Sequence, residues 1–316
     1  GKLNRETGRF PAAAADMEQA IAHFRLAYGD HHPRLVDAMN ELGWVLNIQR
    51  KRDEAEIILN QSRDMGASLL GNAHPDVGNA HYTLGTVRYA RGDNPGAERE
   101  LRAALDIYVA AHGDNHPSVA SAMDTLARVL VRQKRLTEAE ALMRRSIAMR
   151  LRFLGDSSAD YAAGLVGLAN LMRDRADFAQ AAQVYAEAVA AWDRAVGADH
   201  PDTATARARL AGVLLDLGRP VEALPHAEAA LPVIRNRLGE DHHESLRTAL
   251  ALGRALTECG RAPEADPILA QTLSLARAKR RPELLKQALT AQAACHRARE
   301  RPDEAASLEA EAAAIE

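Results

Sequence analysis

The stretch Gly113-Asp114-Asn115-His116-Pro117 decides the fold of this chain, because copies of it recur at a fixed distance along the sequence. Three further copies are close, and two looser copies lack the proline. The glycines that open the copies are Gly29, Gly71, Gly113, Gly155, Gly197 and Gly239. Successive glycines are 42 residues apart, and a fixed period of this size indicates a repeat architecture.

Each repeat unit contains two apolar-periodic segments of helix length, separated by a short polar turn. In the third unit, residues 119–130 and 139–154 each carry the apolar stripe of an amphipathic helix. Pro117 suits the first helical position, where its missing N–H is not needed. Gly113 suits the end of the preceding helix, where a left-handed α conformation is favoured. The stretch is therefore predicted to end one helix and begin the next.

When the repeat units are aligned on their opening glycines, several positions hold identical or small residues in every unit. We call each such position a column. A leucine stands thirteen residues after each glycine, at Leu42, Leu84, Leu126, Leu168, Leu210 and Leu252. The next position is small, at Gly43, Gly85, Ala127, Ala169, Ala211 and Gly253. Two small columns in the second helices hold Ala55, Ala97, Ala139, Ala181, Ala223 and Ala265, and Ser62, Ala104, Ser146, Ala188, Ala230 and Thr272. Small residues at these places let two helix backbones approach closely while the leucine fills the space beside them.

These columns resemble the tetratricopeptide repeat, and the longer unit with its Gly-Asp-x-His-Pro link resembles the repeats of kinesin light chains. The resemblance covers nearly the whole chain, and it implies an all-α, right-handed α–α superhelix of antiparallel helix pairs. The expected organisation is a single solenoid over 1–316, with a partial repeat at 1–28, six repeats at 29–70, 71–112, 113–154, 155–196, 197–238 and 239–280, and a degenerate capping repeat at 281–316. Gly1 falls on a small-residue column, so the sequence is expected to begin inside a helix.

Composition argues against several classes of function. The 40 basic and 43 acidic residues give a net charge of -3, so no nucleic-acid or membrane partner is expected. Cys259 and Cys295 fit no metal or redox spacing, and no run of 18 apolar residues is present. We expect a cytoplasmic protein with reduced thiols, and the excess of arginine over lysine is typical of a G+C-rich, bacterial genome.

The twelve histidines suggest a metal site, but their spacing argues against one. One column holds His32, His74, His116, His200 and His242. Each member lies in a different repeat, whereas zinc ligands must all lie within about 2.3 Å of one ion. We expect these histidines to have a structural role at helix starts, and we expect no metal or cofactor. The sequence contains no phosphate loop, nucleophile elbow or zinc-protease helix, so no enzyme and no catalytic residue is expected.

The first helix of each unit has a face opposite its packing stripe, and in tetratricopeptide proteins this face lines a concave groove. On a helical wheel, positions 8, 11, 12, 15, 18 and 19 after each glycine fall on this face. The partner-binding groove is expected to contain Asn40, Trp44, Asn47, Asn79, Tyr82, Tyr89, Arg128, Arg132, Asn170, Arg173 and Arg209. Thr125, Arg247 and Arg254 are expected on the same open face, whereas Trp192 of a second helix is expected in the core.

In kinesin light chains, two successive asparagines before the column leucine read the backbone of a cargo peptide. Only Asn40 remains at these positions, so the resemblance implies the fold without the cargo motif.

The best-supported function is a protein interaction scaffold that binds a partner segment, expected to be acidic, with an apolar anchor near Trp44. Exposed aromatic residues together with arginine are typical of binding surfaces. Three alternatives remain open: the arginines serve only solubility, the chain is a regulatory arm of a larger signalling protein with an upstream kinase, NTPase or protease, or it is a helical-repeat RNA binder.

Overall fold

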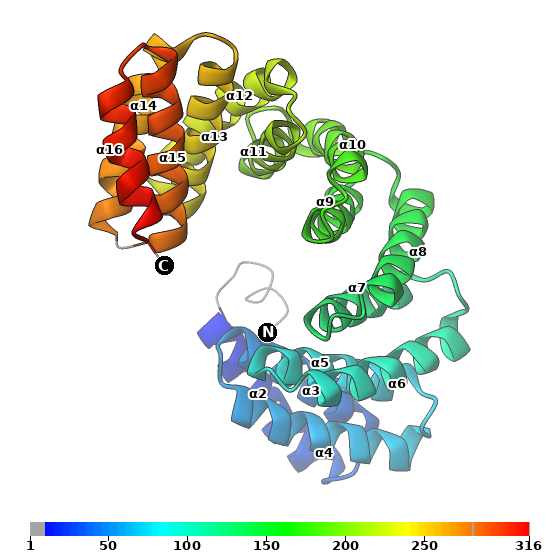
Figure 1. Ribbon diagram of the computed structural model, residues 1–316. Helices are drawn as coiled ribbons and strands as arrows, with labels where there is room; N and C mark the ends of the chain where they lie inside the picture. Colours follow the sequence, from blue (N-terminus) through cyan, green and yellow to red (C-terminus); the bar gives the residue numbers. More distant parts are fainter. Residues whose placement is uncertain (1–9, 280, 316) are drawn as a thin grey trace. The chain divides into compact units, whose positions relative to one another are not determined.

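The protein is built from α-helices joined by short turns, and no strand occurs among the residues that the computed structural model describes, 10–279 and 281–315 (Figure 1). The helices are α2 (Phe10–Tyr28), α3 (Pro33–Ile48), α4 (Arg52–Leu70), α5 (Pro75–Arg91), α6 (Asn94–His112), α7 (Pro117–Arg132), α8 (Leu136–Leu154), α9 (Ala159–Asp174), α10 (Phe178–Val196), α11 (Pro201–Asp216), α12 (Pro220–Leu238), α13 (His243–Glu258), α14 (Ala262–Ala278), α15 (Pro282–Ala298) and α16 (Pro302–Ala313). The expected all-α fold class is confirmed.

Odd-numbered helices are the first helices of the repeats, and even-numbered helices are the second helices. Both types begin and end close to the predicted positions, with Pro117 at the first position of α7. The expectation that Gly1 lies inside a helix falls outside the described residues.

The histidine column caps the first helices, which confirms its structural role. In each case the imidazole Nδ1 accepts the backbone N–H of the residue two positions later, at 3.2 Å. The capping histidines are His32, His74, His116, His200 and His242. Ser158 stands in this column before α9, and its hydroxyl accepts the N–H of Asp160 at the same distance. Capping satisfies one of the backbone donors that a helix start leaves without a partner.

The glycines that open each copy of the repeated stretch, which we call the linker glycines, adopt a backbone conformation that differs from the predicted one. Gly113 has φ 77° and ψ 174°, and Gly71 has φ 88° and ψ 154°. The positive φ was predicted, but the left-handed α conformation was wrong because ψ is extended. This region of backbone space is essentially restricted to glycine. The chain can therefore turn sharply out of the second helix before the capping histidine begins the next one.

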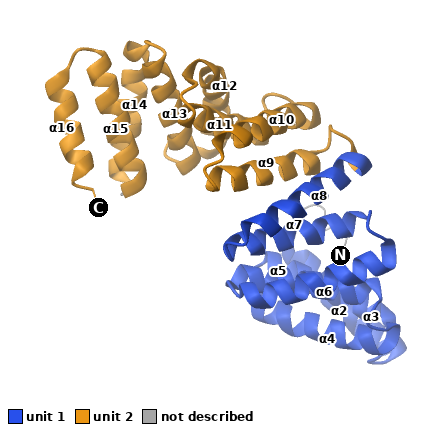
Figure 2. Ribbon diagram, turned by 45° about the vertical axis from the view of Figure 1, so that its right-hand side comes forward, with its two compact units in different colours: residues 1–153 blue, residues 154–316 orange. Residues whose placement is uncertain are grey.

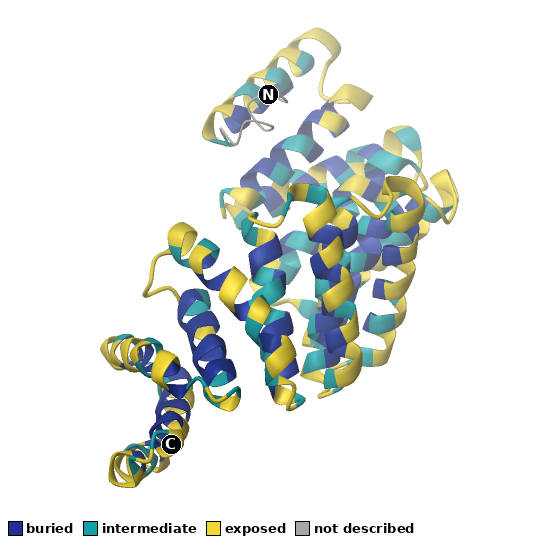
Figure 3. Ribbon diagram, turned by 90° about the horizontal axis from the view of Figure 1, so that it is seen from above, coloured by how far each residue is buried: buried dark blue, intermediate teal, exposed yellow. Residues whose placement is uncertain are grey.

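The small columns lie where helices meet. Ala55, Ala97 and Ala139 are fully buried, and so are Ser62 and Ser146. Buried residues form bands along the helix sides that face neighbouring helices, while the turns and outer sides are exposed (Figure 3). Trp192 is 9% exposed, so its predicted place in the core is confirmed.

The chain divides into two compact units, Gly1–Phe153 and Leu154–Glu316 (Figure 2). Unit 1 holds α2 to α7 and nearly all of α8, and unit 2 holds α9 to α16. Within each unit, a helix pair packs against the next pair along the chain. The single continuous solenoid over 1–316 remains a prediction.

Candidate functional site

The first-helix surface contains the residues that the sequence assigned to a groove, and the structure divides them into buried and accessible groups. Asn40 was expected on the open face, but it is only 7% exposed. Its side-chain N–H donates to the carbonyl of Asp76 at 2.9 Å, and its oxygen accepts the hydroxyl of Ser62 at 2.9 Å. Its placement on the open face was therefore wrong: Asn40 joins α3 to the start of α5 and to α4.

Thr125 requires the same correction, because it is 2% exposed. Its hydroxyl donates to the carbonyl of Ser121 at 3.1 Å and lies 3.4 Å from the hydroxyl of Tyr82. The physical reason is shared with Asn40. A first helix packs against its own second helix and also against the first helices of adjacent repeats, so two of its sides are covered.

Trp44 was expected to be an exposed aromatic residue, but it is half-buried and packs against the core of α2–α4. Its ring meets that of Phe10 edge-on, with centroids 6.2 Å apart. Aromatic pairs in this arrangement are stabilising beyond the area that they bury. Packing therefore accounts for the aromatic residue at position 44.

Most of the other predicted residues of unit 1 connect neighbouring helices. Asn47 of α3 donates to the hydroxyl of Thr86 in α5 at 3.2 Å. The guanidinium of Arg132 in α7 lies 3.9 Å from the ring centroid of Tyr89 in α5 and donates to its carbonyl at 3.0 Å. Asn79 of α5 is exposed and accepts the hydroxyl of Tyr108 in α6 at 2.8 Å. Each of these contacts fixes one helix against the next.

Arg128 of α7 remains accessible. It is exposed, and its closest polar contact is a long hydrogen bond of 3.4 Å to the Thr125 hydroxyl. Its guanidinium is therefore open to solvent.

In unit 2, three of the predicted residues lie together. A depression of about 350 Å³, which we call the arginine pocket, is formed by α9, α11 and α13. It is lined by Asn170, Arg173, Asp174, Ala208, Arg209, Gly212, Val213, Asp216, Glu244, Arg247, Thr248 and Ala251. Asn170, Arg173 and Arg209 were predicted site residues, and Arg247 was expected on the same face.

Hydrogen bonds hold the polar side chains of the arginine pocket. Arg209 donates to the side-chain oxygen of Asn170 at 2.9 Å, and the buried hydroxyl of Tyr185 donates to the same oxygen at 2.5 Å. Burial raises the pKa of Tyr185, so its phenol stays protonated and acts as a donor. Arg173 pairs with Asp174 at 2.9 Å. Arg247 is exposed and forms no ion pair with any of the described residues.

Three carboxylates in the arginine pocket were missed by the sequence reasoning. They belong to Asp174, Asp216 and Glu244. Two of them were detectable, because Asp174 and Asp216 occupy position 19 after their glycines, a position already assigned to the open face. The pocket is therefore a mixed-charge site whose arginines are partly neutralised.

A second depression lies next along unit 2, between α13 and α15, and has a volume of about 380 Å³. We call it the alanine pocket. It is lined by Leu250, Arg254, Thr257, Glu258, Lys286, Gln287, Thr290, Ala291 and Ala294. Its lining is more apolar than that of the arginine pocket, although both pockets use residues of α13.

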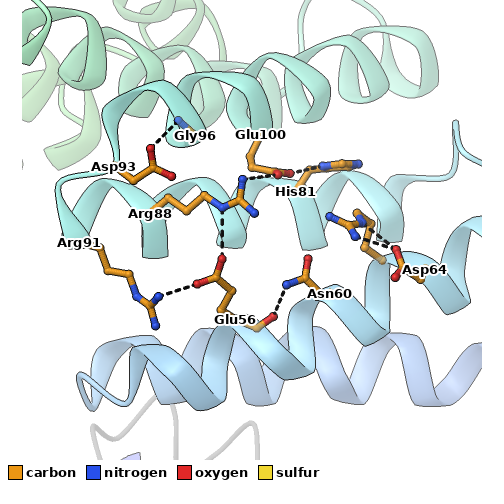
Figure 4. A network of polar contacts seen from close by, with 10 residues as sticks. Glu56, Asn60, Asp64, His81, Arg88, Arg91, Asp93, Gly96 and Glu100 are labelled. Atoms are coloured by element: carbon orange, nitrogen blue, oxygen red, sulfur yellow. Dashed lines mark hydrogen bonds and ion pairs between the residues drawn. The ribbon is translucent and has the colours of Figure 1, made fainter.

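Unit 1 contains a polar network centred on the buried Glu100, between α4, α5 and α6 (Figure 4). Glu100 is 8% exposed, lies 2.6 Å from Nδ1 of His81, and pairs with Arg88 at 2.9 Å. Glu56 pairs with Arg88 at 3.4 Å and with Arg91 at 2.8 Å. Burial alone would raise the pKa of Glu100, but the hydrogen bond from His81 and the charge of Arg88 lower it overall. These side chains satisfy one another, so the network is structural.

In the described part of the chain, no group of three or more His, Cys, Asp or Glu side chains is placed to hold a metal ion. Cys295 is buried and its thiol donates to the carbonyl of Ala262 at 3.3 Å. Among the described residues, no helix is both long enough and apolar enough to cross a bilayer.

Comparison with known proteins agrees with the repeat pattern. A family model described as the tetratricopeptide repeat matches residues 1–68, 76–152, 160–231 and 205–278. No curated protein matches the chain.

Solved structures with kinesin-light-chain-like repeats are similar in fold. BtubC (BKLC) from P. vanneervenii is 19% identical over 73% of this chain and 92% of its own, with a TM-score of 0.64. A putative kinesin light chain of nearly identical repeats from P. anserina is 22% identical over 66% of this chain and 99% of its own, with a TM-score of 0.55. The apo form of the quorum sensor NprR from B. thuringiensis is 13% identical over 99% of this chain and 85% of its own, with a TM-score of 0.62.

At these identities the likeness shows a shared fold alone, while the family model covers most of the sequence. The chain belongs to the tetratricopeptide repeat family, whose members are generally non-enzymatic scaffolds for protein interactions.

Proposed function

We propose that this protein is an interaction scaffold that binds an acidic segment of a partner protein along the first helices of unit 2. The observation that supports this function is the convergence of Arg173, Arg209 and Arg247 from three successive first helices in the arginine pocket. Guanidinium groups pair bidentately with carboxylates, and a concave site shields them more than an open surface does.

The carboxylates of the arginine pocket set a limit on the strength of binding. A partner carboxylate competes with Asp174 for Arg173, whereas Arg247 forms no ion pair among the described residues and is available directly. Each solvent-exposed ion pair contributes at most about 1 kcal/mol to the binding free energy. Affinity must therefore come from several arginines acting together and from burial of apolar surface beside them.

The apolar anchor of the partner segment is better assigned to the alanine pocket than to Trp44. Trp44 is engaged with Phe10, whereas the alanine pocket has Leu250, Ala291 and Ala294 among its lining residues. The two pockets adjoin α13, so one extended segment reaches both within a single compact unit.

The experiment measures fluorescence anisotropy of labelled peptides against the full chain over a salt series. The probes are a peptide of alternating Glu and Ala that ends in Leu, and a matched peptide with Gln in place of Glu. The acidic peptide is expected to bind more tightly, with an affinity that falls as salt screens the charges. Charge reversal by Arg173→Glu and Arg247→Glu is expected to weaken binding and flatten its salt dependence.

The matched control is Arg237→Glu, which makes the same charge change at an exposed position outside the arginine pocket, near the end of α12. Equal losses in the control and in the pocket variants would contradict the assignment of the site. The same titration is repeated with a labelled single-stranded RNA. Tight, salt-dependent RNA binding that the pocket variants abolish would favour the helical-repeat RNA binder instead.

A further inference from the structure

The capping histidines of the first helices work only as neutral imidazoles. A neutral ring has one nitrogen that accepts and one that donates, and capping by Nδ1 requires the proton to be on Nε2. Protonation makes both nitrogens donors, so the ring can no longer accept the backbone N–H. It also adds a positive charge at the N-terminus of a helix, where the helix dipole disfavours it.

The capped helix starts differ in whether a carboxylate lies beside the ring. At His74 and His200, the Nδ1 atom lies 3.5 and 3.6 Å from the carboxylates of Asp76 and Asp202. At these two helix starts a carboxylate therefore lies beside the capping imidazole. At His116 the equivalent residue is Ser118, which carries no charge.

His116 faces a second histidine instead of a carboxylate. Its ring stacks on His112, the last residue of α6, with centroids 4.2 Å apart. The two rings are so close that a positive charge on one of them opposes a second positive charge on the other. Asp114, in the same turn, is paired with Arg145 of α8 at 2.7 Å, and His112 also stacks on the neutral ring of Tyr108.

We propose that the turn from His112 to Pro117, which we call the joint between α6 and α7, is acid-sensitive: protonation of His116 removes the cap of α7 and loosens its first turn. The start of α9, which is capped by Ser158, is unaffected.

The direction of the effect follows from the environment of the ring. Partial burial and the neighbouring His112 both lower the pKa of His116 below its usual value of 6.5. A lowered pKa means that the folded state favours the neutral ring. The stabilising effect of the cap is therefore complete above pH 6.5 and is lost as the pH falls through the lowered value.

The acid-sensitive joint bears on the first-helix surface of unit 1. Helix α7 contacts α5 through Arg132 on Tyr89 and through Thr125 beside Tyr82. This inference does not depend on the proposed acidic partner.

The test is amide hydrogen exchange, measured by NMR on the full chain from about pH 7.5 to about pH 5.5, across the titration range of histidine. Each rate is divided by the intrinsic rate at the same pH, which gives a protection factor. Protection of the Ser118 amide, the partner of His116, is expected to fall as the pH is lowered. Protection of the Asp160 amide, the partner of Ser158, is expected to stay constant in the same sample.

Two variants separate titration of the cap from a general loss of stability. His116→Ser copies the Ser158 cap and is expected to abolish the fall in Ser118 protection. His112→Tyr copies the natural stack of Tyr28 on His32, whose centroids are 4.4 Å apart, and removes the opposing charge. It is expected to move the fall in protection to higher pH.

Constant Ser118 protection down to the lowest pH would overturn the proposal. A parallel fall at Ser118 and Asp160 would also overturn it, because acid would then act on the whole chain and not on this joint. A His112→Tyr variant with an unchanged midpoint would overturn the role given to the histidine pair.

Discussion

Gly85 in α5 lies directly against Leu101 in α6: a β-carbon at position 85 would lie 2.6 Å from Leu101 Cγ. The same relationship recurs in two other repeats, at 2.4 Å between Gly43 and Leu59 and at 2.5 Å between Gly253 and Leu269. Real β-carbons essentially never lie within 3.0 Å of such a neighbour, so one of the two groups would have to shift. The small residue after the column leucine is therefore fixed by the leucine that packs on it.

Substitution Gly85→Ala is expected to destabilise the protein by about 1–3 kcal/mol, because the fully buried Leu101 must shift to make room for the added methyl group. The control is Gly167→Ala in α9, where no atom lies within 4 Å of the added β-carbon. There the gain in helix propensity is expected to stabilise by about 0.5–1 kcal/mol. Urea unfolding measures both, and effects of the same sign would contradict the packing argument.

The conformation of the linker glycines predicts different tolerance to asparagine. Gly113 has φ 77° and ψ 174°, a region that only glycine adopts readily, so Gly113→Asn is expected to destabilise by about 1–3 kcal/mol. Gly92 has φ 86° and ψ 1°, the left-handed α region that asparagine tolerates, so Gly92→Asn is expected to have a smaller effect. Thermal melts compare the two variants, and equal losses would show that positive φ alone sets the requirement.

The buried network around Glu100 predicts a pH-dependent contribution to stability. Glu100→Gln removes the charge that pairs with Arg88 and accepts from His81, so it is expected to destabilise by about 1–3 kcal/mol at neutral pH. The pKa of Glu100 is lowered from 4.5 in the folded state, so the wild-type advantage exists above that value and disappears as the pH falls through the lowered pKa.

Denaturant unfolding over a pH series tests this prediction. The control is Glu54→Gln, whose carboxylate makes an exposed pair with Lys51 and whose loss is expected to stay within about 0.5 kcal/mol. A destabilisation by Glu100→Gln that stays constant at acid pH would show that shape, and not charge, is responsible.

Because His200 caps α11, we expect alanine and serine at position 200 to have different effects on stability. His200→Ala removes the acceptor of the Asp202 N–H and is expected to destabilise by about 0.5–2 kcal/mol. His200→Ser is expected to retain most of the stability, because Ser158 caps α9 in the same column with the same geometry. Thermal unfolding at neutral pH measures both, and a serine variant as unstable as the alanine variant would assign the role of His200 to its stacking on Trp192.

Sequence and structure agree best on the features that repeat. The sequence predicted the repeat period, the helix starts at proline, the histidine column at the helix starts and the buried columns of small residues. Each of these features depends on local backbone chemistry or on packing against the helix that follows directly in the sequence. Part of the site was also readable. Asn170, Arg173 and Arg209 were assigned to one face, and they line one pocket.

What the sequence could not settle is which side of a first helix stays open. A helical wheel drawn for one first helix shows which side is apolar. It does not show that the helix of the next repeat covers a second side. Asn40 and Thr125 are polar and sat on the apparent open face, yet contacts from α5 cover Asn40, and Tyr82 of α5 lies beside Thr125. A hydrogen bond to a neighbour satisfies a polar side chain as water does, so polarity alone did not separate buried from exposed positions.

The sequence by itself determined an all-α repeat of paired helices, because the 42-residue period and the chemistry of glycine, histidine and proline act locally in every unit. Only the tertiary structure decided that three arginines and three carboxylates share one pocket, and that His81, Arg88 and Glu100 form a buried network. These groups come from different helices, and their distances follow from how successive repeats stack, which no single helix encodes.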